Sequence, residues 1–215
     1  MKVIIVMLST FTCLGCFSTT DVRNNYNKDL ETPTYEVLKT EQNFELRQYP
    51  SFLVASVQVS GDFDEASRQG FGILASYIFG DNSAQTKIAM TSPVSVKSDI
   101  QSEKIAMTTP VTVSESSSNQ WTISFSMPSK YTLKSLPTPK NKKIQVSMQK
   151  PQKVAVSIFS GFTSKKALNK QETNLRTWIK AQGLEADQMV NIARYNDPFT
   201  LPWNRRNEVL VQVKS

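Results

Sequence analysis

Residues 50–66, PSFLVASVQVSGDFDEA, decide the fold, because an alternating strand here leads directly into a helix. Apolar residues occupy every second position from Leu53 to Val59, which is the period of a strand with one buried face. A glycine then ends the strand, and acidic residues open a helix, where their charge favours the positive end of the helix dipole. The pattern predicts a strand over residues 52–59 and a helix over about residues 62–79.

The same order of elements recurs in residues 151–167, PQKVAVSIFSGFTSKKA, where Pro151 lies 101 residues after Pro50. This second copy predicts a strand and then a helix over residues 164–181. Two copies of a strand-helix-strand-strand unit favour one compact α+β domain, because a single copy would leave one face of its sheet uncovered. Further alternating runs predict strands at residues 35–39, 44–48, 121–127, 189–195 and 208–213.

Two near-identical octapeptides lie between these halves: KIAMTSPV at residues 87–94 and KIAMTTPV at residues 104–111. Each places Ile and Met at alternate positions before a proline, which favours a strand with the proline at a bulge or an edge. The thioethers of Met90 and Met107 are iron ligands in principle, but their alternation favours packing in the core. Residues 128–143 are basic and contain prolines, so we expect an exposed connection there.

The composition excludes most familiar catalytic and metal sites. The 215 residues carry a formal net charge of +7, and none of them is histidine. Without imidazole there is no Ser-His-Asp or Cys-His catalysis, no His-ligated zinc and no histidine ligand for haem iron. The two cysteines, Cys13 and Cys16, both lie near the N-terminus, so the body has neither a disulfide nor thiolate chemistry. No catalytic or metal-binding residue is predicted.

The N-terminus has the pattern of an export signal. Lys2 precedes a short, mostly apolar run, which suits the h-region of a signal peptide and is too short for a membrane-spanning helix. The run ends in Cys13-Leu14-Gly15-Cys16, which resembles the bacterial lipoprotein box and thereby implies lipidation of Cys16. An ordinary cleaved signal and a buried N-terminal strand are the alternatives. Residues 1–16 are therefore a predicted signal peptide, residues 17–34 a flexible tether, and residues 35–215 the folded domain.

Three motifs in this body occur in the order found in the SOUL haem-binding family. They are the doubled Lys-Ile-Ala-Met-Thr-x-Pro-Val, the helix start Glu65-Ala66-x-Arg68, and the run from Tyr195-Asn196-Asp197-Pro198-Phe199 to Arg205-Arg206-Asn207-Glu208-Val209. Residues 35–214 therefore resemble that family. The resemblance implies a distorted antiparallel β-barrel with two flanking helices, related by a pseudo-twofold repeat, and the binding of haem or another tetrapyrrole. Bacterial effector-binding domains share this fold and take varied ligands, so the fold alone does not fix the ligand.

The first predicted helix has a second apolar side beside the stripe from Ala66 to Tyr77 that suits the sheet. A flat macrocycle with two carboxylates fits an apolar surface that has a cation at its edge. The resemblance places Arg68 near the haem propionates and brings the loop of residues 198–203 to the pocket as a lid. The predicted ligand-binding residues are Arg68, Phe71, Gly72, Ala75, Phe79, Tyr195, Pro198, Phe199, Leu201 and Trp203.

Several roles stay open at this stage. The loop of residues 198–203 can instead cover the helix face as ordinary core. Arg205 and Arg206 can contact an anion or, equally well, pair with Glu208 at the end of a strand. Tyr77 and Tyr195 are oxygen ligands in principle, but we predict no axial iron ligand.

The predicted function is the binding of haem or another porphyrin in a hydrophobic groove, by an exported monomer that is lipid-anchored in the bacterial cell envelope, on a periplasm-facing or outer surface. Its expected partners are a small hydrophobic anionic ligand and the membrane, but not nucleic acid, because the basic residues are spread along the chain. One alternative is an envelope protein that binds a different hydrophobic ligand or a protein partner. A carboxylate-based hydrolase is another, with Glu45 and Glu208 as candidates, but the sequence shows no paired acidic cluster and the chain is predicted not to be an enzyme.

Overall fold

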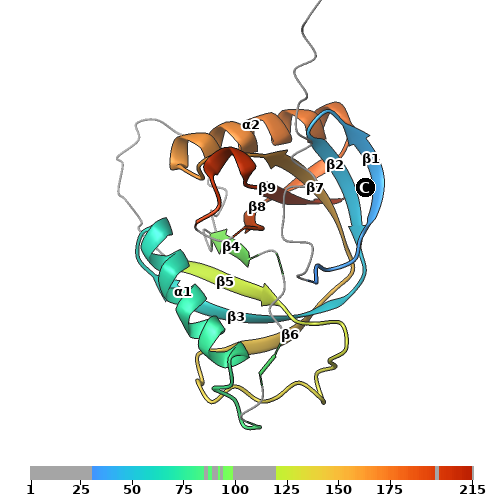
Figure 1. Ribbon diagram of the computed structural model, residues 1–215. Coiled ribbons are helices and arrows are strands. Elements are labelled where there is room, and N and C mark those ends of the chain that lie inside the picture. The colour runs from blue at the N-terminus through green and yellow to red at the C-terminus, as the bar shows by residue number, and fades with distance from the viewer. Residues whose placement is uncertain are drawn as a thin grey trace, which may run out of the picture.

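The computed structural model describes residues 31–84, 87–88, 92, 94–98, 120–196 and 199–214 (Figure 1). This part of the chain folds into a large sheet with two α-helices, each of which follows a long strand. In chain order the elements are β1 (Glu36–Glu41), β2 (Phe44–Tyr49), β3 (Phe52–Ser60), α1 (Phe63–Ile78), β4 (Val94–Ser98), β5 (Gln120–Ser126), β6 (Gln145–Gln149), β7 (Gln152–Phe159), α2 (Lys165–Ala181), β8 (Glu185–Arg194), η2 (Pro202–Asn204) and β9 (Asn207–Lys214).

The strands form one antiparallel sheet in the order β1-β2-β7-β9-β8-β4-β5-β3-β6. Within the described residues the two edge strands, β1 and β6, do not pair with each other. The sheet is therefore open, and the closed barrel that was expected is not confirmed. The order β7-β9-β8 followed by β4-β5-β3 is compatible with two strand-helix-strand-strand units side by side, while the pseudo-twofold repeat itself stays a prediction.

Both helices lie on the same face of the sheet, which we call the helix face. Side chains on this face form the main hydrophobic core with the inner sides of α1 and α2. The alternate side chains of the same strands point to the other face, which we call the open face. A smaller apolar cluster lies there, formed by Tyr49, Val154, Val156 and Ile158.

The two helices begin with the same capping device. Asp62 accepts a hydrogen bond from the backbone N of Glu65 at 2.8 Å, ahead of α1. Ser164 accepts one from the backbone N of Ala167 at 3.3 Å, ahead of α2. Each side chain satisfies a donor that the first helical turn leaves without a backbone partner. The observed helices agree with the predicted ranges of residues 62–79 and 164–181 to within one residue at each end.

Helix α1 packs closely against β3 and β5 through small side chains. Its stripe from Ala66 to Tyr77 faces the core, as predicted. Gly70 permits the closest approach, because a Cβ at this position would lie 2.2 Å from Cγ1 of Ile123. Contact this close is possible only for a residue without a side chain.

Helix α2 packs against the sheet through large side chains. Leu175 and Trp178 are buried against the sheet, and the Trp178 ring stacks on Phe44 with centroids 5.5 Å apart. The indole Nε1 of Trp178 donates to Glu41 Oε2 at 3.0 Å, which ties the helix to the edge strand β1.

The strand predicted at the first octapeptide needs revision, and one observed strand was not predicted. Lys87 and Ile88 lie outside any strand, and β4 begins only after the proline of the first octapeptide, at Val94. The second octapeptide, residues 104–111, lies outside the described residues. Strand β6 was not predicted, although Val146 and Met148 alternate with polar residues in its five-residue sequence.

Candidate functional site

The outward side of α1 exposes aromatic side chains. Phe71 is 39% exposed and Phe79 is 59% exposed, and Arg68 and Gly72 also lie at the surface. Phe71 still touches the sheet, since its ring meets Phe125 edge-on with centroids 5.4 Å apart. Because Phe71 and Phe79 are nevertheless exposed, the alternative in which the loop covers this face as ordinary core is wrong.

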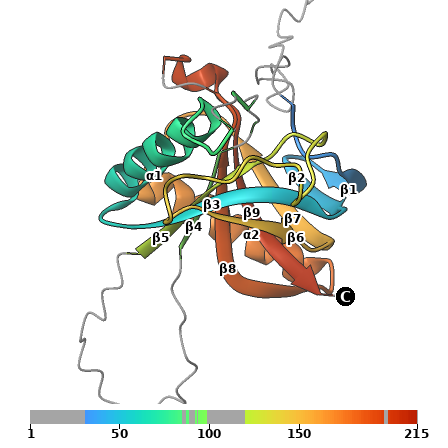
Figure 2. The ribbon, with the colours of Figure 1, turned by 90° about the horizontal axis from the view of Figure 1, so that it is seen from below.

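The loop between β8 and β9 exposes further apolar side chains. Phe199 is 94% exposed, Leu201 is 51% exposed and Trp203 is 64% exposed. Figure 2 shows the turn η2 of this loop, in red, above the sheet on the side where α1 lies. We call the exposed side of α1 together with the described loop residues 199–205 the α1 surface.

Hydrogen bonds hold this loop in place although its side chains are exposed. The backbone N of Gly161 donates to the Pro202 carbonyl at 2.8 Å. The Nε of Arg205 donates to the Thr200 carbonyl at 2.7 Å, and its guanidinium lies 5.9 Å from the ring centroid of Phe162, which is itself exposed. The loop is therefore fixed at its backbone while the apolar side chains of Leu201 and Trp203 remain exposed.

Arg194 connects the base of the loop to the start of α1. It is the last residue of β8, and its Nη2 lies 3.8 Å from Oδ1 of Asp64. Its guanidinium lies 4.8 Å from the ring centroid of Phe63 and donates to the hydroxyl of Thr163. Burial lowers the pKa of Arg194, and the nearby carboxylate of Asp64 opposes that shift. The chain therefore enters the loop close to the N-terminal end of α1.

The structure places most of the predicted ligand-binding residues at the α1 surface, but two of them are buried. Ala75 is only 9% exposed, and Tyr195 is 6% exposed with its hydroxyl donating to Glu208. Tyr195 therefore lies among buried polar groups and not among the exposed rings. Pro198, Cys16, Met90 and Met107 lie outside the described residues. The exposed members of the predicted set are Arg68, Phe71, Gly72, Phe79, Phe199, Leu201 and Trp203.

A buried cluster of charges occupies the open face. Arg47 is fully buried and forms two hydrogen bonds to Glu208, at 3.0 and 2.9 Å, and one to Glu45 at 2.7 Å. Arg206 donates to Oε1 of Glu208 through Nε at 3.1 Å and Nη2 at 2.6 Å, and Tyr195 donates to Oε2 at 2.8 Å. Two guanidinium groups and two carboxylates therefore compensate each other, which is the condition for burying charge at tolerable cost.

The charge state of this cluster follows from its contacts. Burial by itself would raise the pKa of Glu208, but Arg47 and Arg206 hold it below the ordinary value. Burial strongly raises the pKa of Tyr195, with Glu208 adding to the shift. Glu208 is thus an ionised carboxylate that already accepts five hydrogen bonds, and Glu45 is bound to Arg47. Both carboxylates that were considered for a hydrolase are therefore held by Arg47.

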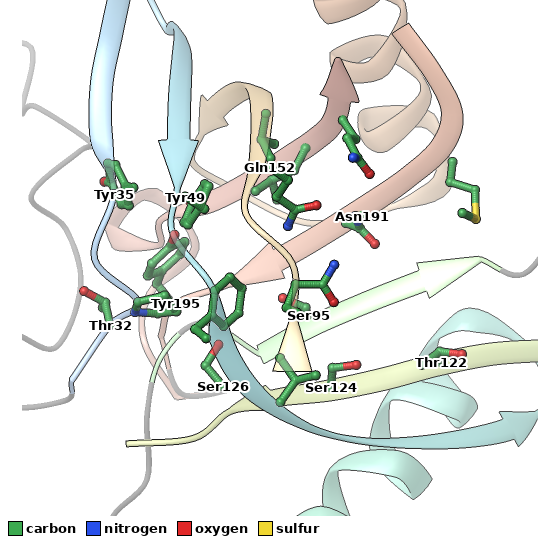
Figure 3. Close-up of a pocket in the computed structure, with 18 of the residues that line it drawn as sticks. Thr32, Tyr35, Tyr49, Ser95, Thr122, Ser124, Ser126, Gln152, Asn191 and Tyr195 are labelled. Atoms are coloured by element: carbon green, nitrogen blue, oxygen red, sulfur yellow. The ribbon is translucent and has the colours of Figure 1, made fainter. Parts of the chain in front are cut away.

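A cavity of about 180 Å³ lies on the open face beside this cluster (Figure 3). Tyr35, Tyr49 and Tyr195 stand at one end of it. Ser95, Ser124 and Asn191 line the other end, on β4, β5 and β8. Ligand pockets for drug-sized molecules usually measure about 300–1,000 Å³. The cavity is therefore too small to enclose a tetrapyrrole.

Neither the cluster nor the cavity was predicted from the sequence. Glu45, Arg47 and Tyr49 alternate along β2, and charged residues at alternate positions of a strand normally indicate a solvent-exposed face. Their partner Glu208 lies on β9, two strands away, because β7 pairs with both β2 and β9. The only available signal was the pairing of Arg206 with Glu208 at the end of a strand, which was one of two interpretations and is now confirmed.

Among the residues that the structure describes, no group of three or more His, Cys, Asp or Glu side chains is arranged to hold a metal ion. In the same part of the chain, neither helix has the length and apolar character needed to cross a bilayer.

Comparison with known proteins identifies the family. Residues 30–101 and 96–212 match the SOUL heme-binding protein family. The chain belongs to this family. Its SOUL relatives include human Heme-binding protein 2, which is 31% identical over 175 residues that cover 80% of this chain and 79% of that protein. Heme-binding protein 1 of Xenopus laevis is 28% identical over 169 residues, covering 77% of this chain and 81% of that protein.

Solved structures share the fold of this SOUL chain at low sequence identity. The C-terminal domain of EcmrR superposes with a TM-score of 0.55 at 12% identity, covering 84% of this chain and 98% of that domain. A hydrolase from Listeria innocua gives a TM-score of 0.53 at 12% identity, covering 82% of this chain and 94% of that protein. These likenesses show the α+β fold and nothing about the ligand.

Proposed function

We propose that this SOUL family chain binds haem or another tetrapyrrole at the α1 surface. The observation that carries the proposal is the exposure of Phe71 and Phe79 on α1 together with Phe199 and Trp203 on the loop. Burying one such side chain is worth about 1.5–3 kcal/mol, so an exposed apolar surface of this kind marks a binding site. The names of the relatives, Heme-binding protein 1 and 2, support a tetrapyrrole as the occupant.

The residues of the α1 surface fit the chemistry of such a ligand. A tetrapyrrole has a flat apolar ring, which aromatic side chains contact well, and carboxylates at one edge, which arginine binds strongly. Arg68 lies on the exposed side of α1 and, within the described residues, makes no hydrogen bond or ion pair. Its guanidinium is therefore available to a propionate, while the cavity on the open face is too small for the ring.

We propose further that the ring is held by contact and charge, without an iron ligand from the described residues. The hydroxyl of Tyr77 donates to the Pro137 carbonyl at 2.6 Å, and burial raises the pKa of Tyr77 to about 12. The hydroxyl of Tyr195 likewise donates to the carboxylate of Glu208, at 2.8 Å. Both phenols are therefore protonated and occupied near neutral pH, and the sequence has no histidine.

Titration of the purified chain with haemin, followed by the haem absorbance, tests this function. We expect saturable binding that weakens about tenfold or more in Phe71→Ala, because the lost ring contact is worth roughly 1.5–3 kcal/mol. Lys170→Ala is the matched control, since Lys170 is an exposed residue on α2. Absence of saturable haemin binding, or equal losses in the two variants, would contradict the proposal.

The place of action is also a proposal. The short apolar run that ends in Leu14-Gly15-Cys16 supports export and lipid anchoring of the domain in a bacterial envelope. We expect Cys16→Ser to abolish incorporation of labelled fatty acid in cells. A wild-type protein that carries no lipid and has its mature N-terminus at another residue would show that the anchor is absent.

A further inference from the structure

The cavity on the open face has the chemistry of a second binding site that is separate from the α1 surface. Two of the strands that border it, β4 and β5, present hydroxyl groups to it in place of the apolar side chains that they turn toward the helices. Strand β3 contributes the apolar side chains of Phe52 and Val54, and β8 contributes Asp187, Met189 and Asn191. Ser124 of β5 pairs with Ser95 of β4, so two hydroxyls lie side by side. Asn191 of β8 and Gln152 of β7 add amide groups, which both donate and accept hydrogen bonds.

These polar groups are available to a ligand. Within the part of the chain that the structure describes, the side chains of Ser95, Ser124, Gln152 and Asn191 make no hydrogen bond to other protein groups, yet each is only partly exposed. They are therefore sheltered donors and acceptors at fixed positions on a rigid sheet. A ligand that supplies hydrogen bonds in return would replace the water around them at little cost.

Most of the charged groups beside the cavity are paired with each other. Glu208 is neutralised by Arg47 and Arg206, so the cluster itself offers no uncompensated carboxylate to a cation. The guanidinium of Arg206 is in turn held by Glu208 and lies over the ring of Tyr195, 4.3 Å from its centroid, so it is not an uncompensated cation for an anion. Asp187, the other charged residue of the lining, accepts from the backbone N of Met189. A neutral ligand suits this environment best.

An aromatic wall completes the cavity. Tyr35 and Tyr49 have ring centroids 5.1 Å apart, and Tyr49 and Phe52 have centroids 6.1 Å apart. Aromatic faces contact the C–H side of a ring while hydroxyl and amide groups bind its polar edge. From the wall, the neutral polar lining and the volume of about 180 Å³, we propose that this cavity binds one neutral pyranose ring. The site lies on the opposite face of the sheet from α1, so this inference does not depend on tetrapyrrole binding.

Nuclear magnetic resonance titration of the ¹⁵N-labelled chain tests the site. The probes are glucose, galactose and N-acetylglucosamine, with benzoate and benzyltrimethylammonium as charged comparisons. We expect at least one pyranose to cause saturable shifts of the backbone amides of Ser95, Ser124, Gln152 and Asn191, and neither ion to do so. Shifts confined to other parts of the chain, the absence of any pyranose response, or a saturable response of these amides to either ion would overturn the inference.

Two variants make the test specific. Asn191→Leu should weaken pyranose binding about tenfold, because it removes hydrogen bonds without removing volume. Asn174→Leu makes the same chemical change on the exposed side of α2 and should leave binding unchanged. If Asn191→Leu loses its dispersed spectrum, Ser124→Val replaces it, since valine suits a strand and also removes a hydrogen-bonding group. Unchanged affinity in the folded cavity variant would contradict the assignment.

Discussion

Helices α1 and α2 have equivalent places in the fold but opposite outward faces. Both follow a long strand, both begin with a side-chain cap, and both pack on the helix face of the sheet. The outward side of α1 carries Phe71 and Phe79, whereas the outward side of α2 carries four lysines: Lys165, Lys166, Lys170 and Lys180. The fold therefore depends on the inner side of each helix, which packs in the core, and leaves the composition of the outward side open.

This difference in the outward faces supports the proposed location of the binding site. The lysines of α2 are hydrated by solvent, and charged residues are usual on the outward face of a surface helix. The exposed aromatic rings on α1 depart from this pattern, and the loop of residues 199–205 adds more of them on the same side of the molecule. The contrast supports α1, and not α2, as the helix that meets the ligand.

The largest effect on the free energy of unfolding is expected at Glu208, whose carboxylate is shared by two buried arginines. Glu208→Gln would leave Arg47 and Arg206 buried without their shared carboxylate, and breaking a buried ion pair costs about 3–5 kcal/mol. Because the cluster joins β2 to β9, the variant should unfold at a lower urea concentration than the wild type, as followed by circular dichroism. A loss below about 1 kcal/mol would show that the cluster is not structural.

The carboxylate of Glu208 should also make the free energy of unfolding depend on pH in the acid range. The pKa of Glu208 is lowered in the folded state from an ordinary value of 4.5. Its contribution is therefore fully present above pH 4.5 and is lost as the pH falls through the lower folded-state value. Urea unfolding of Glu208→Gln should be less sensitive to pH in this acid range than unfolding of the wild type. Parallel profiles for the two proteins would contradict this origin of the acid sensitivity.

The second largest effect on stability is expected from alanine substitutions on the two sides of α1. Gly70→Ala should destabilise the fold by about 1–3 kcal/mol, because its Cβ would collide with Ile123. Gly72→Ala lies two residues away, where a Cβ meets nothing within 4 Å, and should stabilise the helix by about 0.5–1 kcal/mol. Thermal unfolding of both variants measures the difference. Equal effects would mean that α1 does not rest closely on β5.

The smallest effect compares one arginine on each helix. Arg176 of α2 donates to Glu172 and to the carbonyls of Asp187 and Gln188, at 2.8, 2.9 and 2.8 Å. Arg176→Ala should therefore cost about 1 kcal/mol of stability and leave haemin binding unchanged. Arg68→Ala should do the reverse, with stability within about 0.5 kcal/mol of the wild type and haemin binding about tenfold weaker. If Arg68→Ala binds haemin normally, Arg68 does not contact a propionate.

The sequence was sufficient for elements whose patterns are local. The helix start at Asp62, the alternation in residues 52–59 and the apolar stripe from Ala66 to Tyr77 each depend on neighbours a few residues apart, and all three are confirmed. Strand β6 was missed although Val146 and Met148 alternate with polar residues, because two apolar residues in a run of five are a weak local signal and its pairing with β3 is not local. Closure of the sheet likewise depends on which edges pair, and local periodicity contains no such information.

The candidate site was predicted in part for the same reason. The exposed rings of α1 follow from helical periodicity, so Phe71 and Phe79 could be identified from spacing alone. Tyr195 was misplaced because its burial depends on Glu208, which only the strand pairing brings near it. The cavity was invisible because Ser95, Ser124 and Asn191 come from three strands that are distant in the sequence.

The most direct test of the central claim compares haemin with metal-free protoporphyrin on the wild-type chain. If the α1 surface holds the ring through aromatic contacts and Arg68, both ligands should bind with affinities within about tenfold, and Phe71→Ala should weaken both equally. Fluorescence and absorbance titrations at neutral pH measure the two dissociation constants. If haemin binds about a hundredfold more tightly than protoporphyrin, a difference of roughly 2.8 kcal/mol, an iron ligand dominates and the account given for the α1 surface is wrong.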